Sequence, residues 1–163
     1  MLPDASIGAM STAFTVRDAR VGEALVLAEA VIAQPLFQRY GVVAAELARG
    51  MAAGHASGDV LLVAEDDAVR GFAWFQPRGG LALGGYLRVI ALVPGQESRG
   101  VGAALLDEVE RRIPGRHMFL LVSAFNEGAQ RFYARRGYVE RGRLPGLLAP
   151  ELDEVLMYRR LRD

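Results

Sequence analysis

A strand, a glycine-bearing loop and an amphipathic helix follow one another near the middle of the chain and constrain its fold most. A strand predicted over 81–93 stops at a proline, and a helix over about 100–113 begins at Gly100 and Gly102. The next predicted strand, His117–Ser123, has a continuous apolar centre, as expected of a strand buried on both faces. Such a strand–helix–strand unit favours two parallel strands joined by a right-handed crossover.

The remaining hydrophobic patterns predict strands and helices in one continuous domain. They predict a strand over 14–17, a helix over 20–33 capped by Asp18, a helix from Pro35 to about Ala53, strands over 60–64 and 69–75, a helix capped by Asn126 that ends before Gly137, and strands over 138–143 and 155–161 joined by a loop over 144–153. Hairpins predict antiparallel pairs beside the parallel one, so the fold class is α/β with a mixed sheet.

Length and composition narrow the function classes. The 163 residues fit one domain, expected over 13–163 after a flexible N-terminal tail over 1–12. The 19 basic and 19 acidic residues cancel, so no nucleic-acid partner is expected. The absence of cysteine and the presence of only two histidines argue against a metal site. No membrane span or signal peptide is recognised, which predicts a cytoplasmic protein.

The helix that starts at the glycines is suited to binding an anion. A helix N-terminus presents unpaired backbone N–H groups and the positive end of its dipole, and glycine lets a phosphate approach them closely. Arg99 adds a positive charge there. The alternative is a turn that needs glycine only for its backbone angles. The pattern alone leaves both interpretations open.

Two nucleotide-binding motifs match this loop poorly. A P-loop requires Lys followed by Ser or Thr after its second glycine, and neither follows Gly100. A dinucleotide fingerprint requires a third glycine, where Leu105 stands, and an acidic residue after the next strand, which ends in Ser123-Ala124. A dinucleotide-binding oxidoreductase is therefore the third choice of function.

Two short blocks of sequence form a recognisable pair. The first is Arg99-Gly100-Val101-Gly102-Ala103. The second, further along the chain, comprises Asn126, Ala129, Phe132-Tyr133 and Gly137-Tyr138. Together they resemble the coenzyme A loop and the second motif of the GCN5-related N-acetyltransferase (GNAT) family. One departure is Glu97, where the family often has Gln or Arg.

The resemblance implies a fold and a cosubstrate. The fold would be a mixed, mostly antiparallel sheet of six to seven strands flanked by about four helices, with strands four and five parallel and splayed. Acetyl-CoA would lie between those two strands, without a metal. The implied coenzyme contacts are the main chain of Leu92 and Val93, the pyrophosphate loop Arg99, Gly100, Val101, Gly102 and Ala103, and Asn126 beside the pantetheine.

The same resemblance implies an N-acyltransferase that moves acetyl from acetyl-CoA to a primary amine of a small molecule by direct attack. Tyr133 would protonate the leaving thiolate as general acid, although a tyrosine on that helix face can also be a packed core residue. The general base stays open, because strand 81–93 contains no Asp, Glu or His; Ser123 and Glu46 are the alternatives.

A non-catalytic acyl-CoA-binding or sensing module is the second hypothesis, which the missing carboxylate favours. A homodimer formed through the sheet edges stays open, and the acceptor is not identified by the sequence.

Overall fold

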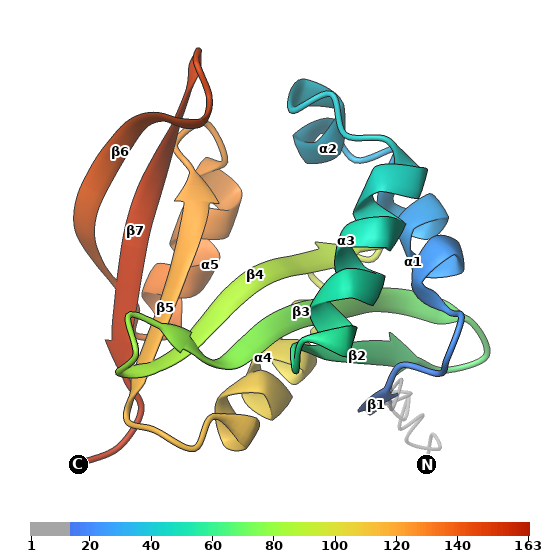
Figure 1. Ribbon diagram of the computed structural model, residues 1–163, viewed down its shortest axis with the longest axis horizontal. Helices are drawn as coiled ribbons and strands as arrows, with labels where there is room; N and C mark the ends of the chain where they lie inside the picture. The colour runs from blue at the N-terminus through green and yellow to red at the C-terminus, as the bar shows by residue number, and fades with distance from the viewer. Residues whose placement is uncertain (1–13) are drawn as a thin grey trace, which may run out of the picture.

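The computed structural model describes residues 14–163, so the predicted tail over 1–12 lies outside the described residues. The elements in chain order are β1 (Thr15–Asp18), α1 (Ala24–Val31), α2 (Pro35–Arg39), α3 (Ala44–Ala56), β2 (Val60–Glu65), β3 (Val69–Gly80), β4 (Gly84–Leu92), α4 (Val101–Arg112), β5 (His117–Ser123), α5 (Glu127–Arg135), β6 (Val139–Ala149) and β7 (Leu152–Arg160), as Figure 1 shows.

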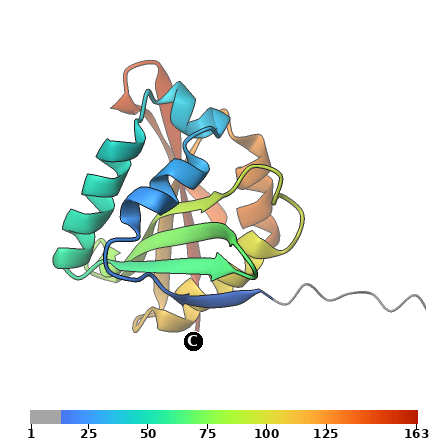
Figure 2. The same ribbon diagram turned by 90° about the vertical axis from the view of Figure 1, so that its right-hand side faces the viewer.

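The strands within residues 14–163 form one seven-stranded sheet in the order β1-β2-β3-β4-β5-β7-β6. All neighbours are antiparallel except β4 and β5, which are parallel, as predicted. Helices α1 and α3 lie on one side of the sheet, and α4 and α5 lie on the other (Figure 2). The predicted α/β class and mixed sheet are confirmed.

Each helical layer encloses its own apolar core. On one side, α4 packs Val101, Leu105, Leu106 and Val109 against the strands, as its sequence pattern predicts. On the other side, α1 and α3 bury Leu27, Val31 and Met51 among residues that include Phe72 and Trp74. Helices and their apolar side chains therefore cover both faces of β2, β3 and β4.

The parallel pair separates before its strands end. Register between β4 and β5 runs from Gly84–His117 to Leu87–Leu120, and no pairing of the two continues beyond it. The ends of the two strands diverge in Figure 1. The last residues of β4 therefore have a strand neighbour, β3, on one edge only.

Three sequence expectations about the helices and β5 need correction. The predicted helix over 35–53 is two helices, because Gly41 adopts φ +65° and ends α2 before α3 starts at Ala44. Helix α1 is shorter than predicted, and Asp18 does not cap it but forms an ion pair with Arg112. Strand β5 is fully buried on one face only, because α1 and α3 cover the other half of the sheet.

The predicted loop over 144–153 is also wrong. Strands β6 and β7 continue through most of it and turn between Ala149 and Leu152. Because β6 is an edge strand, Pro145 can lack an N–H group and Gly146 can adopt φ +60° where the register shifts. This extension brings Glu154 into β7, opposite Ser123 of β5.

Candidate active site

The glycine loop leads into α4 through a residue in the left-handed backbone conformation. Gly100 is the N-cap residue with φ +84°, and the carbonyl of Gly100 accepts the first helical hydrogen bond from Ala104 N at 3.0 Å. The N–H groups of Val101, Gly102 and Ala103 precede that bond and have no partner within the helix. They form a cluster of donors at the positive end of the α4 dipole.

A crevice of about 700 Å³ lies in front of these donors. Its walls come from the end of β4, the glycine loop and α5. The predicted coenzyme residues that line it are Leu92, Gly100, Val101, Gly102, Ala103 and Asn126, and the predicted acid Tyr133 lines it as well. Arg131 and Arg135 of α5 supply positive charge to this crevice. The structure therefore brings the two sequence blocks together around one space.

Two predicted coenzyme residues do not line the crevice. Val93 donates its N–H to Arg70 O at 2.9 Å, and its carbonyl accepts from Gln96 N at 3.1 Å. Arg99 donates from Nη1 to Gln96 Oε1 at 2.9 Å. These contacts make Val93 and Arg99 parts of the loop's internal framework. Glu97, the departure from the family pattern, does line the crevice.

The free edge of β4 borders the crevice. Main-chain groups alternate in direction along an antiparallel strand, so the bond from Val93 to β3 implies that Leu92 and Ile90 present their polar groups to the opposite edge. The Gln34 side-chain amide donates to the Leu92 carbonyl, which agrees with that direction. An extended ligand on this edge could pair with the strand as a neighbouring strand does.

Asn126 and Tyr133 come from opposite ends of α5. The Asn126 side-chain oxygen accepts a bond from Ala129 N at 3.0 Å and caps the helix, as predicted, which leaves the side-chain NH₂ group as a donor. Tyr133 packs edge-on against Phe132 and Tyr138. Burial raises the pKa of the Tyr133 phenol well above its usual value, so the phenol holds its proton at neutral pH.

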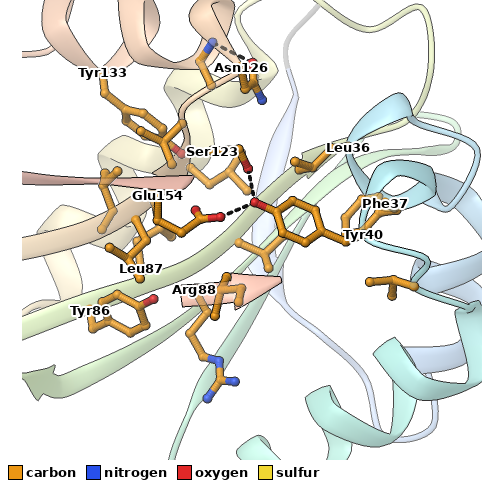
Figure 3. A pocket seen from close by; sticks show the side chains of 18 of the residues that line it. Leu36, Phe37, Tyr40, Tyr86, Leu87, Arg88, Ser123, Asn126, Tyr133 and Glu154 are labelled. Atoms are coloured by element: carbon orange, nitrogen blue, oxygen red, sulfur yellow. Dashed lines mark hydrogen bonds between the residues drawn. The ribbon is translucent and has the colours of Figure 1, made fainter. Parts of the chain in front are cut away.

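A second pocket, of about 400 Å³, lies against the first crevice. The two spaces share Ile90, Asn126, Ala129 and Tyr133 as a common wall. Figure 3 shows this second pocket with Tyr133 entering from α5 and Tyr40 from the opposite side. A group bound at the junction would therefore meet both a coenzyme in the crevice and a second ligand in the pocket.

A buried carboxylate stands in the second pocket. Glu154 of β7 is 2% exposed. Tyr40 donates its hydroxyl to Glu154 Oε1, and Tyr40 Oη is 2.7 Å from Ser123 Oγ (Figure 3). Burial and the Glu154 carboxylate raise the pKa of Tyr40 to about 12. The sequence did not indicate Glu154 or its pairing with Tyr40, because the two residues meet only through the order of β5 and β7 and the short helix α2.

The other candidates for a base lie elsewhere. Glu46 is exposed on α3 and lines neither space. His117 opens β5 and contacts Tyr158 Oη through Nδ1 at 2.9 Å. Ser123 does line the second pocket. Within residues 14–163 there is no cluster of three or more potential metal ligands.

The fold and the crevice define an acetyltransferase of the GNAT type as the class of this protein. The family model described as "Acetyltransferase (GNAT) family" matches residues 23–138, and the chain therefore belongs to that family. No curated protein matches the chain. None of the helices between residues 14 and 163 has the length and apolarity needed to cross a membrane.

Several solved structures share this fold. A GNAT-family structure from Desulfovibrio desulfuricans is 24% identical, with 92% of this chain and 100% of that chain covered and a TM-score of 0.74. The protein yncA from Salmonella typhimurium, solved with its cofactor acetyl-CoA, is 20% identical over 92% and 95% of the two chains, with a TM-score of 0.69. A structure named as a phosphinothricin N-acetyltransferase is 21% identical over 93% and 100%, with a TM-score of 0.74.

Proposed function

We propose that the protein is an acyl-CoA-dependent N-acyltransferase that transfers acetyl from acetyl-CoA to a primary amine of a small molecule. The observation that carries this proposal is the shared wall between the crevice and the second pocket, with Tyr133 in it. Two substrates bound side by side there can react directly, because each supplies its reacting group to the same junction.

The residues of the crevice suit acetyl-CoA. The free N–H groups of Val101, Gly102 and Ala103 would hold the pyrophosphate, with Arg131 and Arg135 available to other phosphate groups. Gln34 occupies the Leu92 carbonyl, so the Leu92 N–H and the Ile90 carbonyl on this edge would pair with the amide groups of the pantetheine arm. The Asn126 side-chain NH₂ would reach the same arm. The structure of yncA, which was solved with its cofactor acetyl-CoA, agrees with this fit.

The chemistry requires few groups from the protein. A main-chain N–H near the end of β4, for which Ile90 is the proposed donor, would stabilise the oxyanion that forms when the amine attacks the thioester carbonyl. The protonated Tyr133 phenol would give its proton to the leaving sulfur. The protein forms no covalent intermediate in this scheme.

The test is a titration of acetyl-CoA followed by measurement of coenzyme A release across a panel of primary amines. Saturable binding with turnover of at least one small amine is the expected result. Tight binding with no release of coenzyme A by any amine would support the alternative, a non-catalytic acyl-CoA-binding module. No binding at millimolar acetyl-CoA would overturn both. A cytoplasmic location and a homodimer stay predictions of the sequence.

A further inference from the structure

The second pocket is lined mostly by apolar side chains and by one buried carboxylate. The apolar side chains include Leu36 and Phe37 of α2, Val42 of the α2–α3 connection, and Leu120 and Leu121 of β5. Of the described residues that line the second pocket, only Arg88 and Glu154 are charged. The Arg88 guanidinium lies 4.1 Å from the centroid of the Trp74 ring and 3.9 Å from Asp59 Oδ2, and it points away from Glu154 (Figure 3).

Glu154 therefore lacks the partner that a buried carboxylate usually has. Its hydrogen-bond neighbour Tyr40, and Ser123 behind it, are neutral hydroxyls, and within residues 14–163 it makes no ion pair. Burial of a carboxylate among apolar groups is costly unless an opposite charge meets it. This unfavourable burial of Glu154 occurs at the wall of a pocket that can admit a small ligand.

We propose that Glu154 selects the acceptor: its carboxylate binds the ammonium group of a primary amine and accepts its proton. This inference rests on the proposed function and deepens it. The remaining walls are apolar and the volume is about 400 Å³, so the acceptor would be an amine with a compact aromatic or aliphatic body. A carboxylate one carbon from the nitrogen would lie against Glu154 and be repelled, so α-amino acids would be poor acceptors.

The proposed steps balance in protons and electrons. Glu154 takes one proton from the ammonium group, and the freed nitrogen lone pair attacks the thioester carbonyl. The new C–N bond forms as the C–S bond breaks, and the sulfur takes a proton from the Tyr133 phenol. The nitrogen then releases its second proton to the Tyr133 oxygen, and the proton on Glu154 passes to solvent when the amide leaves.

A binding experiment tests the recognition step without turnover. Phenethylamine is titrated into the coenzyme A complex of the wild type and of Glu154→Gln, with Glu140→Gln on the exposed face of β6 as the matched control. The Gln side chain can still accept the Tyr40 hydrogen bond, and circular dichroism checks the fold. We expect affinity to fall about 10- to 100-fold in Glu154→Gln and to be unchanged in Glu140→Gln. Equal binding by wild type and Glu154→Gln, or binding by neither, overturns the inference.

Selectivity is tested with matched acceptors in the wild type. Phenethylamine and phenylalanine differ by one carboxylate, and we expect kcat/KM for the amine to exceed that for the amino acid by at least about tenfold. A preference for phenylalanine would contradict the charge argument and leave the acyltransferase proposal standing. Coenzyme A release with neither compound nor any other amine would defeat the acyltransferase proposal itself.

The pH dependence of kcat/KM tests whether Glu154 accepts a proton from the bound ammonium group. In the wild type, kcat/KM for phenethylamine should be nearly level between about pH 7 and pH 9, because Glu154 deprotonates the bound ammonium group. In Glu154→Gln only the neutral amine can react, so kcat/KM should rise about tenfold per pH unit towards the amine pKa of roughly 10. A deficit that stays constant with pH would indicate a structural role and overturn this assignment.

Discussion

Tyr133 is the residue on which the proposed chemistry depends most, because it lies in both spaces and its buried phenol keeps its proton. Replacing it by Phe removes the acid and leaves the ring packing of α5 in place. We expect kcat to fall about 100-fold, with acetyl-CoA affinity nearly unchanged. Steady-state kinetics and calorimetric titration measure the two quantities.

Tyr138 provides the matched control for that substitution. It packs beside Tyr133 but lines neither space, and its hydroxyl donates to Glu110 Oε1 at 2.9 Å. Tyr138→Phe should cost about 1 kcal/mol of stability and leave kcat unchanged, because Arg159 still pairs with Glu110 at 2.9 Å. Equal losses of kcat in the two variants would remove the acid role from Tyr133.

The Glu154 carboxylate should lower the stability of the fold, although the proposed function requires it. A buried carboxylate without a cation destabilises the fold, so Glu154→Gln should raise the free energy of unfolding by about 1 kcal/mol at pH 7 while activity falls. Urea denaturation measures the change. The exposed control Glu140→Gln should stay within about 0.5 kcal/mol of wild type. A destabilised Glu154→Gln would indicate that the charge is already compensated.

Site residues differed in how readily the sequence revealed them. Gly100, Gly102, Asn126 and Tyr133 lie in short contiguous motifs whose local geometry is encoded within a few residues. Glu154 and Tyr40 are 114 positions apart and meet through tertiary packing alone. Glu154 was hidden further by its place next to a Pro- and Gly-bearing stretch that predicted a loop.

At the level of elements, the α4 start requires glycine for its backbone angles. Gly100 has φ +84°, which costs a residue with a Cβ atom about 1–2 kcal/mol, although nothing lies within 4 Å of that position. Gly100→Ala should therefore lower stability by about 1 kcal/mol and weaken acetyl-CoA binding, because relief of the strain would move the amides. Chemical denaturation and calorimetric titration measure both effects.

Gly58 at the end of α3 has φ +98° and equally open surroundings, but it lies outside the crevice. Gly58→Ala should cost similar stability with no change in acetyl-CoA affinity. If Gly100→Ala binds acetyl-CoA as the wild type does, the loop does not hold the coenzyme in the proposed way.

The junction of β1, α1 and β2 carries an acid-sensitive ion cluster. Arg17 contacts Glu23 and Glu65, both at 2.7 Å. The Arg17 hydrogen bond lowers the pKa of Glu23 from 4.5 to about 2, so the stability that this carboxylate contributes is present above about pH 4.5 and is lost as pH falls towards 2.

Between about pH 4.5 and pH 2, protonation of Glu23 should lower the free energy of unfolding of the wild type by on the order of 1–2 kcal/mol, after allowance for solvent screening. Glu23→Gln should lose correspondingly less on acidification, because its contribution is already absent at neutral pH. The exposed pair of Glu127 and Arg131, at 3.5 Å, supplies the control Glu127→Gln. Denaturation at pH 7, 4 and 2.5 gives the comparison, and identical acid losses in Glu23→Gln and wild type would contradict it.

Element types were predicted better than element ends. The sheet strands and α4 and α5 follow strong periodic patterns, and the structure confirms them. The errors at 35–53 and 144–153 have different causes. Gly41 ends α2 locally through its positive φ, whereas Pro145 and Gly146 fit within β6 because it is an edge strand. The sequence does not show which strand will be at the edge, so tertiary position decided the second case.

On the scale of the whole molecule, the separation of β4 from β5 makes the space that the proposed function requires. The sheet stays continuous through its parallel register and opens beyond it, so crevice and pocket meet at the diverging ends of the two strands. Direct transfer within this arrangement requires both substrates to be bound together. Double-reciprocal plots of initial rate against amine concentration, at several acetyl-CoA concentrations, should therefore intersect. Parallel lines indicate an acyl-enzyme intermediate and would argue against direct transfer.

A crystal structure with coenzyme A tests the central claim most directly. We expect the pyrophosphate against the N–H groups of Val101, Gly102 and Ala103, the pantetheine along the free edge at Leu92, and the sulfur beside the Tyr133 hydroxyl. Coenzyme density anywhere else on the protein, or a sulfur turned away from Tyr133, would contradict the account.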